Sequence, residues 1–217
     1  MKILCVSDYI DPLVYSASIK ERFQDVDLVL SAGDLPLEYL EFIVSCLNKP
    51  LLFVFGNHNL QEFHRYKKSA LPWPEDINQG SGSVHIGSQV RIEEGLIVAG
   101  LGGSVMYNRG QNQYTEFGMF LEMVKLIPAL IINRIFRKRF LDILLTHAAP
   151  RDIHDKKDPC HRGFRVFRAF MRIFKPAYLI HGHIHLYDLA DLRTTRYHDT
   201  WVVNAYSHYI INIEELP

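Results

Sequence analysis

Five short segments of this chain end in residue types that bind metal ions. They are Ser7-Asp8, Gly33-Asp34, Gly56-Asn57-His58, Thr146-His147 and Gly182-His183-Ile184-His185. Carboxylate, amide oxygen and imidazole suit divalent ions such as Mn, Fe, Zn, Co and Ni. A carboxylate with two oxygens, such as Asp34, can bridge two ions, and ions about 3.5–4 Å apart stabilise both the attacking and the leaving oxygen of a phosphoryl displacement. The pattern therefore predicts a dinuclear hydrolytic centre.

A short apolar run precedes each of these segments, as expected of strands that are buried on both faces. The runs are Ile3–Val6, Leu28–Leu30, Leu51–Phe55, Ile143–Leu145 and Tyr178–Ile180. In an open sheet of such strands, binding sites form at the carboxyl ends of the strands. Gly33 and Gly56 fit this arrangement, because a loop that closes tightly around a metal needs residues without Cβ. Five distant segments can thus deliver their polar side chains to one place.

Each segment taken alone has a plainer explanation. Gly-Asp and Gly-Asn are common in turns, because Asx side chains bond to their own backbone. His147 alone is more typical of a hydrogen-bonded core histidine. His183 and His185 occupy alternate positions, which face the same side of an extended segment. The occurrence of all five segments in this order, each at a strand end, favours the metal site.

The order Asp, Gly-Asp, Gly-Asn-His, His, Gly-His-x-His resembles that of the calcineurin-like metallophosphoesterases. The resemblance extends from Ser7 to about His185. It implies an α/β fold, a four-layer αββα sandwich of two sheets flanked by helices, with a two-metal centre at the strand ends. We expect residues 1–217 to form a single domain of this type, because this length suits one compact core.

The resemblance also implies a role for each of the motif residues. One ion would be bound by Asp8, Asp34 and His185. The other would be bound by Asp34, Asn57, His147 and His183. His58 would face the scissile phosphate, where it would protonate the leaving oxygen or stabilise charge.

The implied activity is hydrolysis of a phosphomonoester, phosphodiester or pyrophosphate bond by a metal-bridging hydroxide. The expected substrate is a phosphorylated small molecule or a nucleotide. The expected cofactors are two divalent ions, with Mn favoured over Fe, Zn, Ni and Co. The alternative is a scaffold or regulatory protein on the same fold, with a weakened metal site.

Two positions depart from the family pattern. The first motif is usually Asp-x-His, but its third position here is Ile10, so the first ion lacks a nitrogen ligand and should be bound weakly. Asp11 is a candidate replacement, although Asp11-Pro12 is also typical of a helix N-cap, which we favour. The residue after Gly-Asn-His is usually acidic, but here it is Asn59, so a charge that would raise the pKa of His58 is absent.

Two loops are candidates for binding the substrate. The first is the polar loop 101–114, in which Asn108 is the candidate contact; a solvated crossover is the alternative. The second, Arg151–Arg162, follows His147, and His161 and Arg162 are candidate phosphate contacts, since arginine binds phosphate with two hydrogen bonds. In the alternative, Asp158-Pro159 forms a turn and His161-Arg162 begins a helix.

Composition indicates a soluble, folded protein. Of 217 residues, 48% are hydrophobic and 12% aromatic, and 24 basic residues balance 24 acidic ones, so no global field attracts nucleic acid or an anionic membrane. Three widely spaced cysteines favour a reducing compartment over a disulfide framework. The start of the chain resembles no signal peptide and no apolar run is long enough to span a membrane. We expect a cytoplasmic protein without stable membrane insertion, and the sequence makes no prediction of its oligomeric state.

The remaining segments alternate between helix and strand patterns. Helices are expected at Ser16–Phe23, Pro36–Cys46, Thr115–Phe140 with a break or kink at Pro128, and Gly163–Phe174. Ser83–Ile86, Gln89–Glu93 and Leu96–Ala99 are expected to form a strand meander that joins the two halves. Further strands are expected at Leu186–Leu192, Thr200–Asn204 and Tyr209–Ile213.

One stretch is both basic and apolar. Between Lys125 and Arg139 there is no acidic residue, and five basic residues alternate with apolar ones. Such segments can lie on a membrane or bind phosphate backbones, so a lipid-linked or nucleic-acid substrate is an alternative. We favour a helix packed on the core with a solvated basic face.

Overall fold

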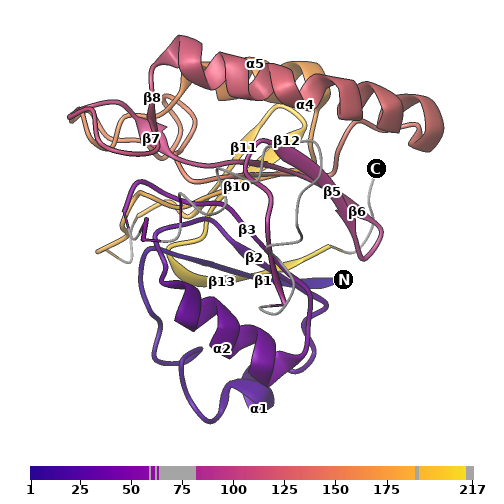
Figure 1. Ribbon diagram of the computed structural model, residues 1–217, viewed down its shortest axis with the longest axis vertical. Coiled ribbons are helices and arrows are strands. Elements are labelled where there is room, and N and C mark those ends of the chain that lie inside the picture. Colours follow the sequence, from indigo (N-terminus) through magenta and orange to yellow (C-terminus); the bar gives the residue numbers. More distant parts are fainter. Residues whose placement is uncertain (59, 62, 64–81, 189–190, 214–217) are drawn as a thin grey trace.

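The computed structural model describes residues 1–58, 60–61, 63, 82–188 and 191–213. Two large sheets lie face to face, and helices cover the outer face of each (Figure 1). This four-layer α/β arrangement confirms the fold class predicted above.

The first sheet has the strand order β13-β1-β2-β3-β4. Its strands are β1 (Lys2–Ser7), β2 (Leu28–Ser31), β3 (Leu51–Phe53), β4 (Ser83–His85) and β13 (Ser207–Asn212). Strands β1 to β4 are parallel, and β13 pairs with β1 in the antiparallel sense. The helices α1 (Ile19–Phe23) and α2 (Leu37–Leu47) cover its outer face (Figure 1).

The second sheet has the strand order β11-β12-β10-β9-β6-β5. Its strands are β5 (Gln89–Glu93), β6 (Leu96–Leu101), β9 (Ile143–Thr146), β10 (Tyr178–His181), β11 (Thr194–Tyr197) and β12 (Thr200–Asn204). The four inner strands are parallel and the two outer pairs are antiparallel. The helices α4 (Glu116–Arg137) and α5 (Arg165–Phe174) cover its outer face, and a small parallel pair, β7 (Ser104–Val105) and β8 (Gln113–Tyr114), precedes α4.

The central core lies between the two sheets. Cys5 and Leu30 of the first sheet pack there with Val98, Leu145 and Ile180 of the second. Because both faces of the inner strands are covered, these strands are apolar at every position, which is the pattern that identified them in the sequence. All three cysteines are free, and Cys5 alone is fully buried in this core.

Several expected elements differ in extent or partner. The first helix begins at Ile19 and not at Ser16. The expected meander is wrong, because β4 pairs with β3 in the first sheet whereas β5 and β6 form a hairpin in the second. Between β4 and β5 the chain crosses from the first sheet to the second. Here the Ile86 carbonyl packs against Gly100, where a Cβ would lie only 2.4 Å from the carbonyl oxygen.

The expected break at Pro128 does not occur, and α4 is continuous. Pro128 lies on the exposed side of the helix, where water can satisfy the carbonyl that loses its partner, while Leu126 and Leu130 pack on the core on either side of it. The expected strand Leu186–Leu192 is also wrong within the described residues. The carboxylate of Asp191 accepts from the backbone N–H groups of Tyr187 and Asp188, so the chain turns, and the strand begins at Thr194.

Candidate metal centre

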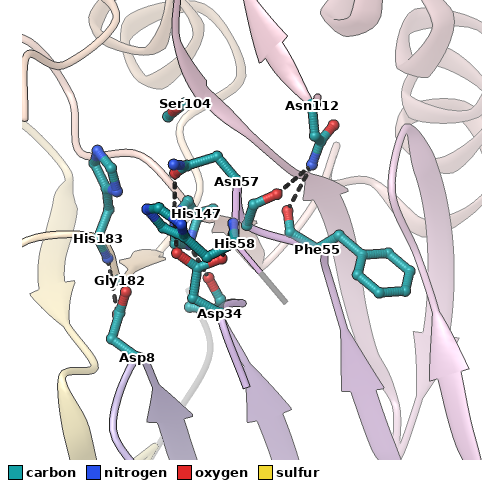
Figure 2. A network of polar contacts seen from close by, with 12 residues as sticks. Asp8, Asp34, Phe55, Asn57, His58, Ser104, Asn112, His147, Gly182 and His183 are labelled. Carbon is teal, nitrogen blue, oxygen red and sulfur yellow. Dashed lines mark hydrogen bonds and ion pairs between the residues drawn. The ribbon is translucent and has the colours of Figure 1, made fainter. Parts of the chain in front are cut away.

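The motif residues follow strands that are neighbours in the two sheets. Asp8, Asp34 and Asn57 follow β1, β2 and β3, while His147 and His183 follow β9 and β10. Both sets of strands are parallel, so their carboxyl ends lie at one edge, where the two sheets meet. Figure 2 shows these side chains converging there.

His147 lies at the centre of this cluster and is completely buried. Its Nδ1 is 2.8 Å from the carbonyl oxygen of Ala32, which can only accept a hydrogen bond, so Nδ1 carries a proton. Its Nε2 lies 3.3 Å from Oδ2 of Asp34 and 3.2 Å from Oδ1 of Asn57. If His147 is neutral, its Nε2 carries no proton. Nε2, Oδ2 of Asp34 and Oδ1 of Asn57 are then three hydrogen-bond acceptors that face one another without a donor.

Such an arrangement requires a cation, either a second proton on His147 or a metal ion. Burial would lower the pKa of His147, but the carboxylates of Asp34 and Asp8 outweigh burial and raise this pKa to about 9. Burial would raise the pKa of Asp34, but His147 and the backbone N–H of His58 lower it to about 2. The nitrogen and two oxygens are the ligand types that suit a divalent ion.

His183 completes this set of ligands. One ligand atom each from Asp34, His147 and His183 lie within 4.8 Å of one another. The Nε2 of His183 is 2.6 Å from the carbonyl oxygen of Cys160, so Nε2 carries the proton and Nδ1 keeps its lone pair. Burial lowers the pKa of His183 to about 3, so the ring is neutral and able to bind a metal.

Asp8 and His185 lie beside this group. The Oδ1 of Asp8 is 3.9 Å from Nε2 of His185, and its Oδ2 accepts from the backbone N–H of His183 at 2.8 Å. The ring of His185 is half-exposed, stacks on Tyr206 at a centroid distance of 4.8 Å, and its Nδ1 is 2.7 Å from the hydroxyl of Tyr187. Burial raises the pKa of Asp8, and the charge of Asp34 adds to this effect. A second cation would stabilise both carboxylates in their ionised form.

The backbone at the site is strained. Asp8, Asp34 and His183 have φ angles of 62°, 56° and 65°, in the left-handed region that such residues rarely adopt. Asp34 closes against Gly56 so tightly that a Cβ on Gly56 would lie 2.0 Å from Oδ1 of Asp34. Strain of this kind persists only where surrounding contacts impose it, and it is concentrated at functional sites.

Ile10 and Asp11 do not take part in this cluster. The side chain of Ile10 is 43% exposed, so it is not turned into the core. Oδ1 of Asp11 accepts from the backbone N–H of Leu13, and Oδ2 accepts from Ser207 and His208. Asp11 thus stabilises a turn and joins it to β13, with both oxygens engaged. The expectation that Asp11 is a helix N-cap is wrong, because α1 begins at Ile19 and its N-cap is Ser18.

The four residues predicted to act on the substrate lie in different environments. His58 is exposed, and its backbone N–H donates to Oδ1 of Asp34. The ring of His161 is 5.5 Å from that of His183, and Arg162 is exposed next to it. Asn108 is exposed in its loop, and its side-chain oxygen accepts from Gly110 and Gln113. Asn59 lies outside the described residues.

Other residues that contact the ligands were not singled out in the sequence. The hydroxyl of Tyr107 accepts from Asn57 at 3.3 Å. The side-chain amide of Asn112, shown in Figure 2, donates to the carbonyls of Phe55 and Gly56. Both belong to loop 101–114, which was predicted to shape the site, although Asn108 was chosen in their place. No local signal distinguishes these three polar residues, because only tertiary contacts decide which of them reaches the ligands.

A cavity of about 440 Å³ lies on one side of His185. Ile184, Leu186 and Leu192 supply apolar lining, and the polar groups are those of Asp152, His154, Asp155, Lys156, Asp191 and Thr195. The cavity is thus continuous with a candidate metal ligand and has room for a small organic group.

Comparisons with known proteins agree with this geometry. The family model described as calcineurin-like phosphoesterase matches residues 1–187. No curated protein sequence matches the chain. Among solved structures, the protein TT1561 of Thermus thermophilus is similar, with a TM-score of 0.63 and 13% identity over 95% of this chain and 89% of that chain.

Two more solved structures are similar. Another crystal structure has a TM-score of 0.64 and 14% identity over 97% of this chain and 94% of that chain. A mutant of Vps29 from Entamoeba histolytica has 15% identity over 95% of this chain and 74% of that chain, but its TM-score of 0.40 is too low to support an argument. At these identities the likeness indicates the fold alone.

The close contact at Gly56 predicts that a single methyl group there will weaken metal binding. In Gly56→Ala the new Cβ must displace the Asp34 carboxylate, so we expect metal affinity to fall by about 10–100-fold, the range for changes that reorient ligands. Metal content after dialysis and circular dichroism are the measurements. Gly118→Ala is the matched control, because its Cβ would meet nothing closer than 3.3 Å. Metal affinity at the parent level in Gly56→Ala would show that this contact does not position Asp34.

The raised pKa of His147 predicts that metal binding releases a proton. With a pKa of about 9, His147 holds a second proton at neutral pH in the metal-free protein, and that proton must leave Nε2 before a metal binds there. Affinity should therefore fall as the pH is lowered from about 9, by up to about tenfold per pH unit. Calorimetry in buffers of different ionisation enthalpy measures the released proton, which His147→Gln should abolish. A binding enthalpy that is the same in every buffer would contradict this account.

Proposed function

Since the chain belongs to the calcineurin-like phosphoesterase family, whose model covers residues 1–187, we propose that it hydrolyses a phosphoester at a dinuclear metal centre. The observation that carries the proposal is the meeting of Asp34 and Asn57 oxygens with Nε2 of His147, an arrangement that requires a cation, either a second proton on Nε2 or a metal ion. The family is one of metal-dependent phosphoester hydrolysis; the number of ions and the bond cleaved are our proposal.

We assign one ion to Asp34, Asn57, His147 and His183, and the other to Asp8, Asp34 and His185. Divalent ions in these positions would supply an activated water molecule and stabilise charge on the phosphoryl oxygens. The second group of ligands lacks the nitrogen donor that Ile10 replaces, and Asp11 has both oxygens engaged elsewhere. We therefore expect that ion to be held less tightly, with Mn preferred over Zn or Ni because oxygen ligands predominate.

Hydrogen bonds within the chain hold His58 and the ligand histidines in place. The backbone N–H of His58 donates to Asp34 at 2.8 Å, so the residue is held against the ligand group while its imidazole remains exposed. We propose that the imidazole acts at the open side of the centre, where it would protonate the leaving oxygen. The carbonyls of Ala32 and Cys160 accept from Nδ1 of His147 and Nε2 of His183, so the other nitrogen of each ring is the one available to a metal.

Polar groups at the rim suit a phosphorylated small molecule or nucleotide. His161 and Arg162 lie near His183, where they would bind phosphate oxygens. Asn108 could bind the substrate only if its side chain released its hydrogen bonds with Gly110 and Gln113. The cavity beside His185 would take the organic group of the substrate. Monoester, diester and pyrophosphate substrates all fit this description.

The alternative is a binding protein on the same fold with a weakened metal site. Ile10 favours it, because a family ligand is lost there. The gathering of left-handed Asp8, Asp34 and His183 around one group of ligands favours a site that still binds metal. Activity measurements separate the two.

We expect hydrolysis of an activated phosphoester such as p-nitrophenyl phosphate or its bis-ester when Mn²⁺ is added, and loss of this activity with a chelator. Asp34→Asn should reduce turnover more than any other single ligand substitution, because Asp34 serves both ions. Asp25→Asn is the matched control, since Asp25 is exposed and, among the described residues, pairs only with Lys2. Near-parental turnover of Asp34→Asn with Mn²⁺ would exclude the dinuclear assignment, and inactivity of metal-loaded parent protein on all phosphoesters tested would favour the binding protein.

His58 should act on the leaving group without binding metal. His58→Asn should lower turnover about 10²–10⁴-fold, the range for lost acid catalysis, while metal content stays at the parent level. Substrates with good leaving groups should lose less, because they need less protonation. His198→Asn, at an exposed histidine in the turn between β11 and β12, is the matched control. Parallel loss of metal would instead make His58 a structural residue.

A further inference from the structure

The solvent-facing side of α4 is apolar. The helix packs on the second sheet through Met119, Met123, Leu126 and Leu130. Its opposite side faces outward, over the top of the molecule in Figure 1. Eight large apolar side chains on the helix are exposed, which are Phe117, Phe120, Leu121, Val124, Ile131, Ile132, Ile135 and Phe136. This differs from the expected solvated basic face.

The spacing of these residues shows that most of them share one side of the helix. At 100° per residue, positions 117, 121, 128 and 135 lie within about 30° of the line opposite the buried face, and positions 124 and 131 lie about 50° and 70° from it. Those positions hold Phe117, Leu121, Val124, Pro128, Ile131 and Ile135. The one charged residue within the same range of angles is Lys125, about 50° from this line, and it pairs with Glu122. A contiguous apolar stripe of this kind on a soluble protein indicates an interaction surface.

At the carboxyl end of α4, Arg134 and Lys138 lie beside this apolar face, whereas Arg137 lies on the side of the buried residues. Lys125 pairs with Glu122, and Arg139 pairs with Asp142. Within the described part of the chain, no carboxylate forms an ion pair with Arg134, Arg137 or Lys138. An apolar stripe beside uncompensated cations matches an interface whose apolar interior is edged by negative charge, which is the arrangement of an anionic lipid surface.

We propose that α4 docks the protein on anionic membranes, lying in the plane of the interface with its apolar face among the acyl chains. A second copy of this chain is the competing occupant. It would bury the same apolar side chains, but it offers no free carboxylate on α4 to match the cations. Both acidic residues of the helix are engaged within the chain: Glu116 accepts from the backbone N–H of Val166, and Glu122 accepts from Ser88 and Lys125. No helix among the described residues is long and apolar enough to cross a membrane.

Sedimentation of the full-length protein with vesicles tests this proposal. We expect binding to phosphatidylcholine vesicles that contain phosphatidylglycerol, much weaker binding to phosphatidylcholine alone, and weakening by salt. The double variant Ile131→Glu/Ile135→Glu should lower the partition coefficient at least about tenfold, since each change removes an apolar contact and adds a negative charge. Arg137→Glu/Lys138→Glu should lower it by at least about fivefold per lost cation at low salt.

Ile92→Glu is the matched control, because Ile92 is 43% exposed on the edge strand β5, outside α4. All substituted side chains are exposed, and circular dichroism together with hydrolysis of a soluble substrate confirms that each variant is folded. Four outcomes would overturn the proposal. They are no vesicle binding, equal binding to neutral and anionic vesicles, binding that the two double variants leave unchanged, and dimers in light scattering that Ile131→Glu/Ile135→Glu abolishes without any vesicle binding by the parent.

Discussion

The arrangement of atoms around Nε2 of His147 is the constraint on which the site depends. This buried nitrogen faces a carboxylate oxygen and an amide oxygen, while the carbonyl of Ala32 occupies the other side of the ring. Bringing three acceptors together in the interior is unfavourable unless a cation lies among them. The same electrostatics that raise the pKa of His147 to about 9 in the absence of metal also create affinity for a divalent ion. Metal binding and the stability of this region are therefore coupled.

The fold supplies the means to hold such an unfavourable arrangement. Parallel strands of both sheets end at one edge, and their apolar interiors fix the strand positions from both sides. The chain must then turn sharply to aim its side chains inward, which explains the left-handed conformations of Asp8, Asp34 and His183. The absence of Cβ at Gly56 lets the β3 segment close on Asp34. Part of the stability of the large core thus compensates for strain that is confined to the site.

The proposed membrane surface lies on a different part of the molecule from the metal centre. The centre is formed at the strand ends, whereas α4 covers the outer face of the second sheet (Figure 1). Loop 101–114 links the two in sequence, since it contacts the ligand segments through Tyr107 and Asn112 and leads directly into α4. Docking through α4 would hold the rim of the centre close to a membrane without covering the ligands. The two inferences are independent, because neither requires the other to hold.

The strands and the candidate ligands were predictable because they depend on local patterns. Buried parallel strands are apolar at every position, and each candidate ligand follows such a run directly, so the sequence alone indicated that Asp34, His147 and His183 would meet. Contacts between distant segments were not predictable. The choice of Tyr107 and Asn112 over Asn108, the engagement of Asp11 by β13, and the turn stabilised by Asp191 depend on partners that no local pattern specifies. The apolar residues of α4 were visible as a periodic pattern, but a helix with two apolar faces does not reveal which one packs on the core. Only the packing of α4 against the second sheet decides that, because the sheet can cover one side of the helix and must leave the other exposed.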